Sequence, residues 1–253
     1  MSKIGLIIAD THNYALANNA LQNTINRINP KHVLVYTDHE IFGNGYDKKI
    51  IEKISSIEKY NELILTQIVE HVELDHYLII QYDGFALNGS KFIEDFLKYD
   101  YIGAPWPQFP NRKVGNGGFS LRSKKIIEAS AHLALTRRSG EAEDIFICQT
   151  IGEKLEKNFS IQFADELIAS KFSYEAPYSN RDTFGFHGFL NLPIVYQKQP
   201  EYLLQNLDRK TIINRLTELM FGISQCEIND KNNFLELLSK FDFNERNFND
   251  KIT

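Results

Sequence analysis

An aspartate and a glycine close an apolar run in the first half of the chain. Residues 77–82 (YLIIQY) predict a buried strand, and Asp83 and Gly84 follow it directly. Side chains two positions apart in a strand share a face, so Gln81 and Asp83 are expected to point the same way. Ligands bind beyond the carboxyl ends of strands in open α/β sheets, which places Asp83 to contact a divalent cation. Asp-Gly is also a common turn dipeptide, so a plain turn is the alternative.

Three glycines lie within four positions of the segment VGNGGF, residues 114–119. Glycines let a backbone approach a ligand closely and present its N–H groups, so Asn116, Gly117 and Gly118 are candidate ligand contacts. The segment has neither the Gly-Lys-Ser/Thr ending of a P-loop nor the GxGxxG dinucleotide fingerprint. A tight turn or bulge before a strand is the alternative.

Two acids and one histidine further along the chain could also carry chemistry. Glu143 and Asp144 stand just before an apolar helical stripe, where acids favour the helix dipole. A carboxylate at such a rigid position could instead accept the proton of a hydroxyl group. His187 lies in FGFHG (184–188), whose glycines leave room for the imidazole to turn inward as a metal ligand. A lone histidine is, however, more often a hydrogen-bonded core or surface residue.

The elements that must position these residues follow an α/β pattern. Residues 4–9 (IGLIIA) and 33–37 (VLVYT) predict buried strands, with an amphipathic helix between them. Polar residues follow each strand, namely Asp10 and Thr11 after the first and Asp38 after the second. A βαβ unit of this kind favours a parallel sheet with helices on its faces.

The remaining patterns extend the same fold. They predict helices over 60–72, 124–135, 144–156 and from about 208 onward, short strands over 100–105 and 160–164, and a strand entered by the glycine-rich turn of 114–121. The Lys/Ile-rich part of 41–58 also has a helical pattern. We therefore expect one α/β domain over residues 1–205 and a C-terminal helical extension, residues 206–253, packed on it.

Composition narrows the function classes. The chain has 253 residues, with 28 Lys and Arg against 33 Asp and Glu, a net charge of −5. This balance argues against a protein that coats nucleic acid. Two cysteines are too few for a disulfide scaffold, and we expect both to be buried thiols in a reducing compartment. The sequence shows no secretory signal and no transmembrane segment, so we expect a cytoplasmic protein, with association at the periphery of a membrane left open.

Five segments, taken together and in order, identify a protein family more specifically than any one of them does alone. They are QYDG (81–84), YDYIGAPW (99–106), VGNGGFSLRS (114–123), the acid pair at 143–144 and FGFHG (184–188). This series resembles a glycosyltransferase-like domain family of GT-A type whose specificity is unknown. The resemblance covers roughly residues 75–190, and its two longest segments are its most particular ones.

The resemblance implies a GT-A fold, a Rossmann-like and mixed but mostly parallel sheet flanked by helices. It also implies a hexosyltransferase that moves a sugar from a nucleoside-diphosphate sugar, a UDP-sugar first of all, to a hydroxyl group. The acceptor would be a glycan or glycolipid, as in the biosynthesis of a polysaccharide.

The resemblance further implies a metal site. In GT-A enzymes an acidic DxD motif ends a central strand and holds Mn²⁺ or Mg²⁺ on the donor diphosphate. Gln81, Tyr82 and Asp83 occupy that place, so only Asp83 offers a carboxylate. His187 matches the late histidine that completes the metal site in several GT-A families.

Roles for other residues follow from the same resemblance. Asp144 matches the carboxylate that deprotonates the acceptor in inverting members, and its neighbour Glu143 is expected to cap the helix or hold a neighbouring group. Trp106, the only tryptophan, either stacks on an acceptor sugar or fills the core. The expected donor contacts are Asp10, Thr11, Asp38, Gln81, Tyr82, Asn116, Gly117 and Gly118.

Two other function classes stay open at this point. A non-catalytic module that binds a nucleotide sugar or a glycan is favoured by Gln81, which stands where the motif has its first acid. A metal-dependent hydrolase would use the same Asp and His ligands. Such a hydrolase would need more carboxylates at strand ends than the three that the sequence offers, Asp10, Asp38 and Asp83.

Overall fold

The computed structural model describes residues 3–40, 45–110, 112–175 and 181–240. Its contacts divide the chain into two units, Met1–Gly188 and Phe189–Thr253. The division falls after Gly188, whereas the sequence placed the boundary between residues 205 and 206. Packing of the C-terminal extension on the first domain stays a prediction, and residues 241–253 of that extension lie outside the described part.

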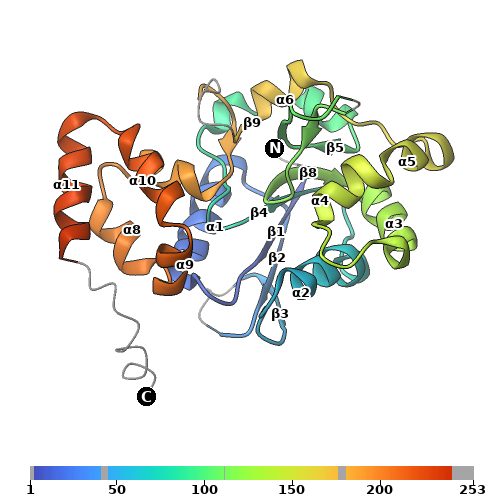
Figure 1. Cartoon of the computed structure of the whole chain (residues 1–253). Coiled ribbons are helices and arrows are strands. Elements are labelled where there is room, and N and C mark those ends of the chain that lie inside the picture. Colours follow the sequence, from blue (N-terminus) through green and yellow to red (C-terminus); the bar gives the residue numbers. More distant parts are fainter. Residues whose placement is uncertain (1–2, 41–44, 111, 176–180, 241–253) are drawn as a thin grey trace. The chain divides into compact units, whose positions relative to one another are not determined.

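A six-stranded sheet forms the centre of the first unit (Figure 1). Its strand order is β3-β2-β1-β4-β8-β5. Strands β1, β2, β3 and β4 run parallel to one another, and β8 runs antiparallel to β4 and β5. The expected mixed, mostly parallel α/β fold is therefore confirmed. The bounds are β1 Gly5–Ala9, β2 His32–Thr37, β3 Asp47–Ile50, β4 His76–Ile80, β5 Tyr101–Ile102 and β8 Phe119–Ser123.

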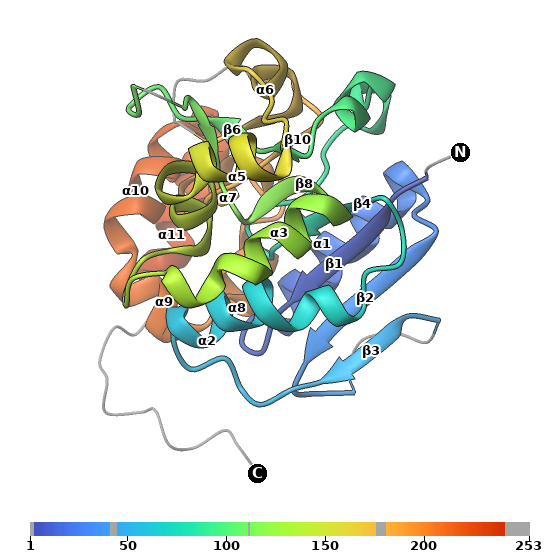
Figure 2. The same ribbon diagram turned by 90° about the vertical axis from the view of Figure 1, so that its right-hand side faces the viewer.

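Helices cover both faces of this sheet, which explains why its central strands are continuous apolar runs. Ile7 of β1 and Ile79 of β4 point to one face, where they pack in a cluster with Ile64 and with Ile127 of α3. Their neighbours in sequence point to the opposite face. Figures 1 and 2 show α1 (Tyr14–Ile28) on one side of the sheet, and α2 (Ile57–Glu62) and α3 (Lys124–Leu133) on the other.

The helices of the first unit largely follow the predicted stripes. Two of these stripes contain π-helical turns, at Leu63–Gln67 and Phe146–Thr150, so neither is one regular α-helix. The α-helices are α1 Tyr14–Ile28, α2 Ile57–Glu62, α3 Lys124–Leu133, α4 Glu143–Ile145, α5 Gly152–Phe159 and α6 Glu166–Phe172. Single 3₁₀ turns lie at Ile68–Glu70, Gly89–Lys91, Glu94–Lys98 and Ala134–Thr136.

Two local predictions are wrong. Within 41–58 the Lys/Ile-rich segment forms strand β3 rather than a helix, because its backbone pairs with β2 at the edge of the sheet. Residues 160–164 are not a strand, and a single bridge joins Phe163 to Tyr101. In both cases the backbone partner, which a sequence pattern does not contain, decides the conformation.

In the described part of the chain, two small sheets lie outside the main one. Strand β9 (Ser173–Tyr174) pairs in parallel with β10 (Gly185–Phe186), and β6 (Ala104–Pro105) pairs with β7 (Val114–Gly115). The first of these brings the chain just after residue 174 beside the chain just after residue 186.

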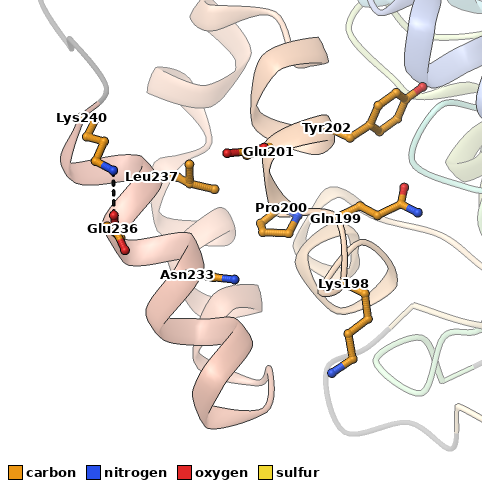
Figure 3. Close-up of a pocket in the computed structure, with 9 residues that line it drawn as sticks. All are labelled: Lys198, Gln199, Pro200, Glu201, Tyr202, Asn233, Glu236, Leu237 and Lys240. Atoms are coloured by element: carbon orange, nitrogen blue, oxygen red, sulfur yellow. Dashed lines mark hydrogen bonds and ion pairs between the residues drawn. The ribbon is translucent and has the colours of Figure 1, made fainter.

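The second unit is helical, as predicted for the C-terminal part. A cavity of about 560 Å³ lies between α8 and α11 (Figure 3). The helices are α7 Leu192–Val195, α8 Pro200–Asn206, α9 Arg209–Asn214, α10 Leu216–Ser224 and α11 Ile228–Ser239, preceded by a 3₁₀ turn at Phe189–Asn191.

Both cysteines are free thiols, but only Cys148 is fully buried. Cys226 is partly exposed, against expectation, because it follows the last turn of α10. None of the helices in the described ranges is both long and apolar enough to cross a bilayer.

Candidate functional site

The order of the central strands creates a switch point at the carboxyl end of β1. The chain passes from β1 through β2 and β3 on one side and then returns to form β4 on the other side of β1. In open α/β sheets this is where ligands bind. Asp10 follows β1, and Gln81 to Asp83 follow β4, so two of the predicted groups flank the switch point.

The antiparallel direction of β8 brings the glycine-rich segment to the same edge. Phe119, the first residue of β8, pairs with Ile80, the last residue of β4. The loop before β8 therefore lies beside the residues that follow β4. A parallel strand would have placed its far end there instead.

His187 is the point on which several site residues converge. Its Nε2 atom lies 3.2 Å from Oε1 of Gln81 and 3.8 Å from Oδ1 of Asp83. Its Nδ1 atom lies 3.3 Å from Oε1 of Glu175, which follows β9. The Asp-Gly dipeptide does form a turn, and the contact of Asp83 with a cation stays a prediction. Gln81 and Gly84 exchange two backbone hydrogen bonds in a tight turn, and that turn directs Gln81 and Asp83 toward the imidazole.

The glycines of the site make room for protein side chains. A Cβ atom on Gly84 would lie 2.7 Å from Cδ2 of His187, and one on Gly118 would collide with Nε2 of the same ring. A Cβ atom on Gly117 would collide with the carboxylate of Glu143. The N–H group of Gly117 donates to Oδ2 of Asp144 at 2.9 Å. The expected contact of these glycines with a donor stays a prediction.

Electrostatic interactions around His187 favour its charged form. Burial disfavours the imidazolium, but the hydrogen bond to Glu175 and the charges of Asp83, Glu175 and Asp144 outweigh burial and raise the pKa of His187. Burial also disfavours the Glu175 carboxylate. The hydrogen bond and charge of His187, together with hydrogen bonds from Trp106 and Asn116, outweigh burial, so the pKa of Glu175 is lowered. In the protein alone, these acids therefore stabilise a proton on His187.

Asp83 and His187 fit a shared divalent cation. Ligand distances of about 2.0–2.6 Å allow one ion to contact two atoms that are 3.8 Å apart. Gln81 Oε1 offers a further oxygen. Within the described ranges, no group of three or more His, Cys, Asp or Glu side chains is arranged to hold a metal ion. Such an ion would complete its shell with phosphate oxygens or water, a common arrangement for Mg²⁺.

The acid pair divides between two environments. Glu143 is 3% exposed, and both of its carboxylate oxygens accept hydrogen bonds of 2.9 Å from the guanidinium of Arg122. Asp144 is partly buried and faces the loop through Gly117. Glu143 thus holds a neighbouring group, and Asp144 is the acid of this pair beside the glycine-rich loop.

The Arg122–Glu143 pair is an ion pair inside the protein. Burial lowers the pKa of Arg122, but Glu143 outweighs burial and the net shift is upward. Burial raises the pKa of Glu143 against the pull of Arg122. The raised pKa of Arg122 favours a charged guanidinium, whereas the raised pKa of Glu143 favours a neutral carboxyl group. The two hydrogen bonds of 2.9 Å between them favour the ionised state of both groups.

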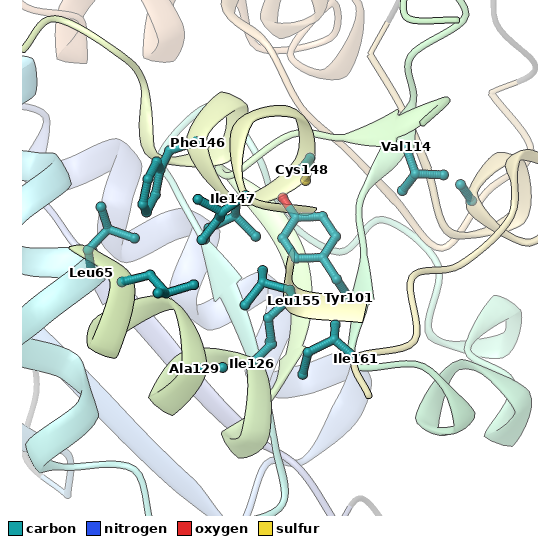
Figure 4. Close-up of a cluster of buried hydrophobic side chains, with 13 residues drawn as sticks. Leu65, Tyr101, Val114, Ile126, Ala129, Phe146, Ile147, Cys148, Leu155 and Ile161 are labelled. Carbon is teal, nitrogen blue, oxygen red and sulfur yellow. The ribbon is translucent and has the colours of Figure 1, made fainter. Parts of the chain in front are cut away.

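A hydrophobic cluster fixes the helix that carries the acid pair (Figure 4). Phe146 and Ile147, just after Asp144, pack in it with Tyr101 and Leu155. Burying a large apolar side chain stabilises a fold by about 1.5–3 kcal/mol, so this cluster holds the start of α4 firmly.

A small cavity of about 150 Å³ lies at the switch point. Its floor includes Asp10, which is 8% exposed and whose Oδ1 accepts the N–H groups of His12 at 2.7 Å and Asn13 at 2.6 Å. Burial raises the pKa of Asp10 to about 6, and the charge of Asp83 adds to this. The lining residues are Ala9, Asp10, Thr11, His12, Asn13, Ile54, Tyr60, Gln81 and Tyr82.

The predicted donor contacts do not all reach this cavity. Asp38 does not line it, and its Oδ1 accepts a hydrogen bond of 2.7 Å from the Tyr14 hydroxyl. Asn116, which is fully buried, and the two glycines after it also lie outside the lining. Trp106 is 7% exposed and donates its indole N–H to Oε2 of Glu175 at 2.6 Å. Its expected stacking on an acceptor stays a prediction.

Sequence reasoning missed two residues of the site. Glu175 directly follows a short strand, as Asp10 follows β1, and this position is a usable signal. Arg122 is a charged residue in a strand that is otherwise buried, and a lone charge of that kind requires a partner. Two cavities that are larger than the one at the switch point contain none of the predicted site residues. They are the cavity of the second unit and one of about 380 Å³ lined by residues of 50–67.

Comparison with known proteins agrees with this fold. No curated protein is significantly similar in sequence. A solved structure, described as that of a glycosyltransferase involved in the glycosylation of the major capsid of PBCV-1, is similar to 74% of this chain and to 92% of its own. The TM-score is 0.50 and the sequence identity is 10%, so the likeness concerns the fold alone.

A sequence family matches the chain directly. It is described as "Protein of unknown function (DUF5672)", and the match covers residues 46–187. That range is more than half of the chain and contains Gln81, Asp83, Asp144, Glu175 and His187. The chain therefore belongs to this family of proteins of unknown function.

Proposed function

We propose that the chain is a glycosyltransferase that moves a sugar from a nucleoside-diphosphate sugar to a hydroxyl group of a glycan acceptor. The observation that carries the proposal is the convergence of Gln81 and Asp83 on His187 at the switch point. Asp144 is close enough for its charge to act on the same histidine. The glycosyltransferase fold of the similar solved structure supports the proposal at a coarse level.

The charges of the site favour a donor that binds together with a divalent cation, Mn²⁺ or Mg²⁺. No Lys or Arg is among the residues that line the small cavity. Asp10 and Asp83 lie at the same edge of the sheet and would repel a diphosphate. An ion held by Asp83 and His187 would neutralise charge on the leaving diphosphate.

Asp144 is the proposed general base. An acceptor hydroxyl is a poor nucleophile and needs a proton acceptor aligned behind it. The N–H groups of Gly117 and Ile145 orient the Asp144 carboxylate, whose oxygens retain further lone pairs. The hydroxyl oxygen would form a bond to the anomeric carbon as the bond to the diphosphate breaks. The hydroxyl proton would pass to Asp144, with inversion at the sugar.

Thermal unfolding with nucleoside diphosphates, with and without Mn²⁺, tests the proposal. UDP is the first to try. A ligand at 100 times its dissociation constant should add about 2.7 kcal/mol to the free energy of unfolding. The stabilisation should require Mn²⁺ and disappear in Asp83→Asn. It should persist in Asp95→Asn, which changes an exposed acid of the same unit.

Turnover separates the function classes. A transferase should slowly hydrolyse one nucleotide sugar without an acceptor and turn it over faster with one. Binding without any turnover would indicate a non-catalytic module, and hydrolysis of substrates without a sugar would indicate a hydrolase. If no nucleoside diphosphate or nucleotide sugar stabilises the protein with or without Mn²⁺, the proposal is wrong.

A further inference from the structure

Glu175 is a carboxylate of the site to which the proposed function gives no role. It follows β9, and β10 places it beside His187. Its Oε2 atom accepts a hydrogen bond of 2.6 Å from the indole N–H of Trp106. Its Oε1 atom lies 3.3 Å from Nδ1 of His187. Glu175 thus connects the only tryptophan of the chain to the proposed metal ligand.

The chemistry of the three groups fixes the direction of both hydrogen bonds. An indole N–H can only donate, so Oε2 of Glu175 must accept. An ionised carboxylate also only accepts, so Nδ1 of His187 must carry the hydrogen of the second bond. In the neutral imidazole the other nitrogen, Nε2, then accepts through its lone pair, so the Gln81 amide must turn its NH₂ group toward Nε2 for their 3.2 Å contact to be a hydrogen bond.

The backbone around the ring directs that lone pair. Gly84 and Gly118 pack so closely against the ring edge that contains Cδ2 and Nε2 that neither position has room for a Cβ atom. On this edge, Nε2 faces the side-chain amide of Gln81 and the carboxylate of Asp83. The unprotonated nitrogen is therefore Nε2, which lies beside the carboxylate of Asp83.

We propose that Glu175, oriented by Trp106, is a positioning residue that keeps His187 in the Nδ1–H tautomer and so presents Nε2 to a metal ion. Its effect on metal binding rests on the proposed function, whereas its effect on the tautomer does not. Carboxylate partners of this kind typically change metal affinity by about 10- to 100-fold when they are removed. In this proposal Trp106 acts through its N–H group, which binds Glu175, rather than through the face of its ring.

Glu175→Gln gives the sharpest test, because it reverses one hydrogen bond. The Trp106 N–H would occupy the new amide oxygen, so the NH₂ group would face Nδ1 of His187 and could only donate. The hydrogen of the imidazole should then move to Nε2. ¹⁵N NMR of the ring nitrogens in the metal-free protein, at an alkaline pH where the imidazole is neutral, reports this exchange of tautomers directly.

A second substitution separates positioning from a merely structural role. In Trp106→Phe/Glu175→Gln the indole N–H no longer holds the amide oxygen away from His187. The amide can then turn its oxygen toward Nδ1, so the Nδ1–H tautomer should return. Trp106→Phe alone should leave the tautomer unchanged, because Glu175 still only accepts. Glu128→Gln, in the exposed face of α3, is the matched control and should have no effect.

Mn²⁺ alone is the probe for the consequence, measured by electron paramagnetic resonance of the free ion. Glu175→Gln should weaken Mn²⁺ binding about 10- to 100-fold, and the double variant should recover part of this loss. If Glu175→Gln does not fold, Glu175→Asp serves instead. Its shorter side chain should lose the bond to His187 and give a mixture of tautomers.

The outcomes keep the two proposals apart. An unchanged tautomer in Glu175→Gln, or a double variant identical to it, overturns the positioning role. Absence of Mn²⁺ binding in the unmodified protein contradicts the metal in the proposed function, while the NMR result still decides the role of Glu175.

Discussion

The Nε2 atom of His187 lies 3.8 Å from Oδ1 of Asp83, although the two residues are far apart in sequence. The backbone supports this relationship, because the N–H group of Gly188 donates to the carbonyl oxygen of Asp83 at 2.8 Å. A turn after one strand and the end of another are thus joined by their main chains as well as by their side chains.

Asp83→Asn and His187→Gln should each weaken Mn²⁺ binding, and their effects should not add. Two ligands of one ion act as a unit, so the Mn²⁺ affinity of the double variant should be nearly the same as that of the single variant that binds Mn²⁺ more weakly. Titration of Mn²⁺ into all four proteins measures this. Effects that add fully in free energy would mean that the two side chains do not share an ion.

Asp144→Asn and Glu143→Gln should differ in kind. Loss of the base should lower turnover by about 10²- to 10⁴-fold and leave donor affinity nearly unchanged. Glu143→Gln should instead destabilise the fold by about 3 kcal/mol or more, because it leaves the charge of Arg122 buried without compensation. Turnover, donor binding and urea unfolding, measured for both variants, test whether Asp144 is catalytic and Glu143 is structural. Near-normal turnover in Asp144→Asn would contradict its role as base.

Gly118→Ala should impair metal binding more than it impairs folding. The new methyl group would push against Nε2 of His187 and Oε1 of Gln81, two side chains that can move. Gly140→Ala is the comparison, since φ at Gly140 is +80° and its Cβ would meet nothing within 4 Å. That substitution carries only backbone strain, of order 1–2 kcal/mol. Mn²⁺ affinity should fall in the first variant and not in the second.

Asp10→Asn should make stability less sensitive to pH. The folded pKa of Asp10 is raised to about 6, above roughly 3.9 in the unfolded chain, so the folded protein binds the proton more tightly. The free energy of unfolding should therefore fall as pH rises from about 4 to 6 and stay lower above that. Asparagine keeps an oxygen for both N–H groups and has no charge to bury.

The variant should match the unmodified protein near pH 4 and exceed it by about 2–3 kcal/mol at pH 8. Urea unfolding at both pH values measures the difference. The exposed Asp95→Asn controls for a general effect of net charge. An equal gain at both pH values would show that Asp10 does not titrate as described.

The sequence predicts the central strands well because their burial is written into local patterns. The runs before Asp10, Asp38 and Asp83 are mainly apolar, and polar groups mark where each run stops. Strand β3 could not be predicted in this way, because it is extended through its pairing with β2 and its own residue pattern does not indicate a strand.

The candidate site is harder to predict, because its geometry depends on contacts between distant segments. The motif order contains Asp83 and His187, and their proximity follows from the fold. No spacing shows that Glu143 turns to Arg122 while Asp144 turns to the loop, since that depends on where β8 lies. Glu175 has a strand-end position as a signal, but its partner Trp106 is visible only in three dimensions.

The bond between Gly188 and Asp83 has a consequence for the order in which the protein folds. Strands β1, β2 and β4 need only the first third of the chain, whereas the contact with His187 closes a loop of more than one hundred residues. Closing long loops costs entropy that local structure does not, so such contacts tend to form late. On the ribosome, the cavity beside Asp10 can therefore take shape while the histidine is still to be made. The two halves of the site are acquired at different moments, and the second must dock onto a surface that has already folded.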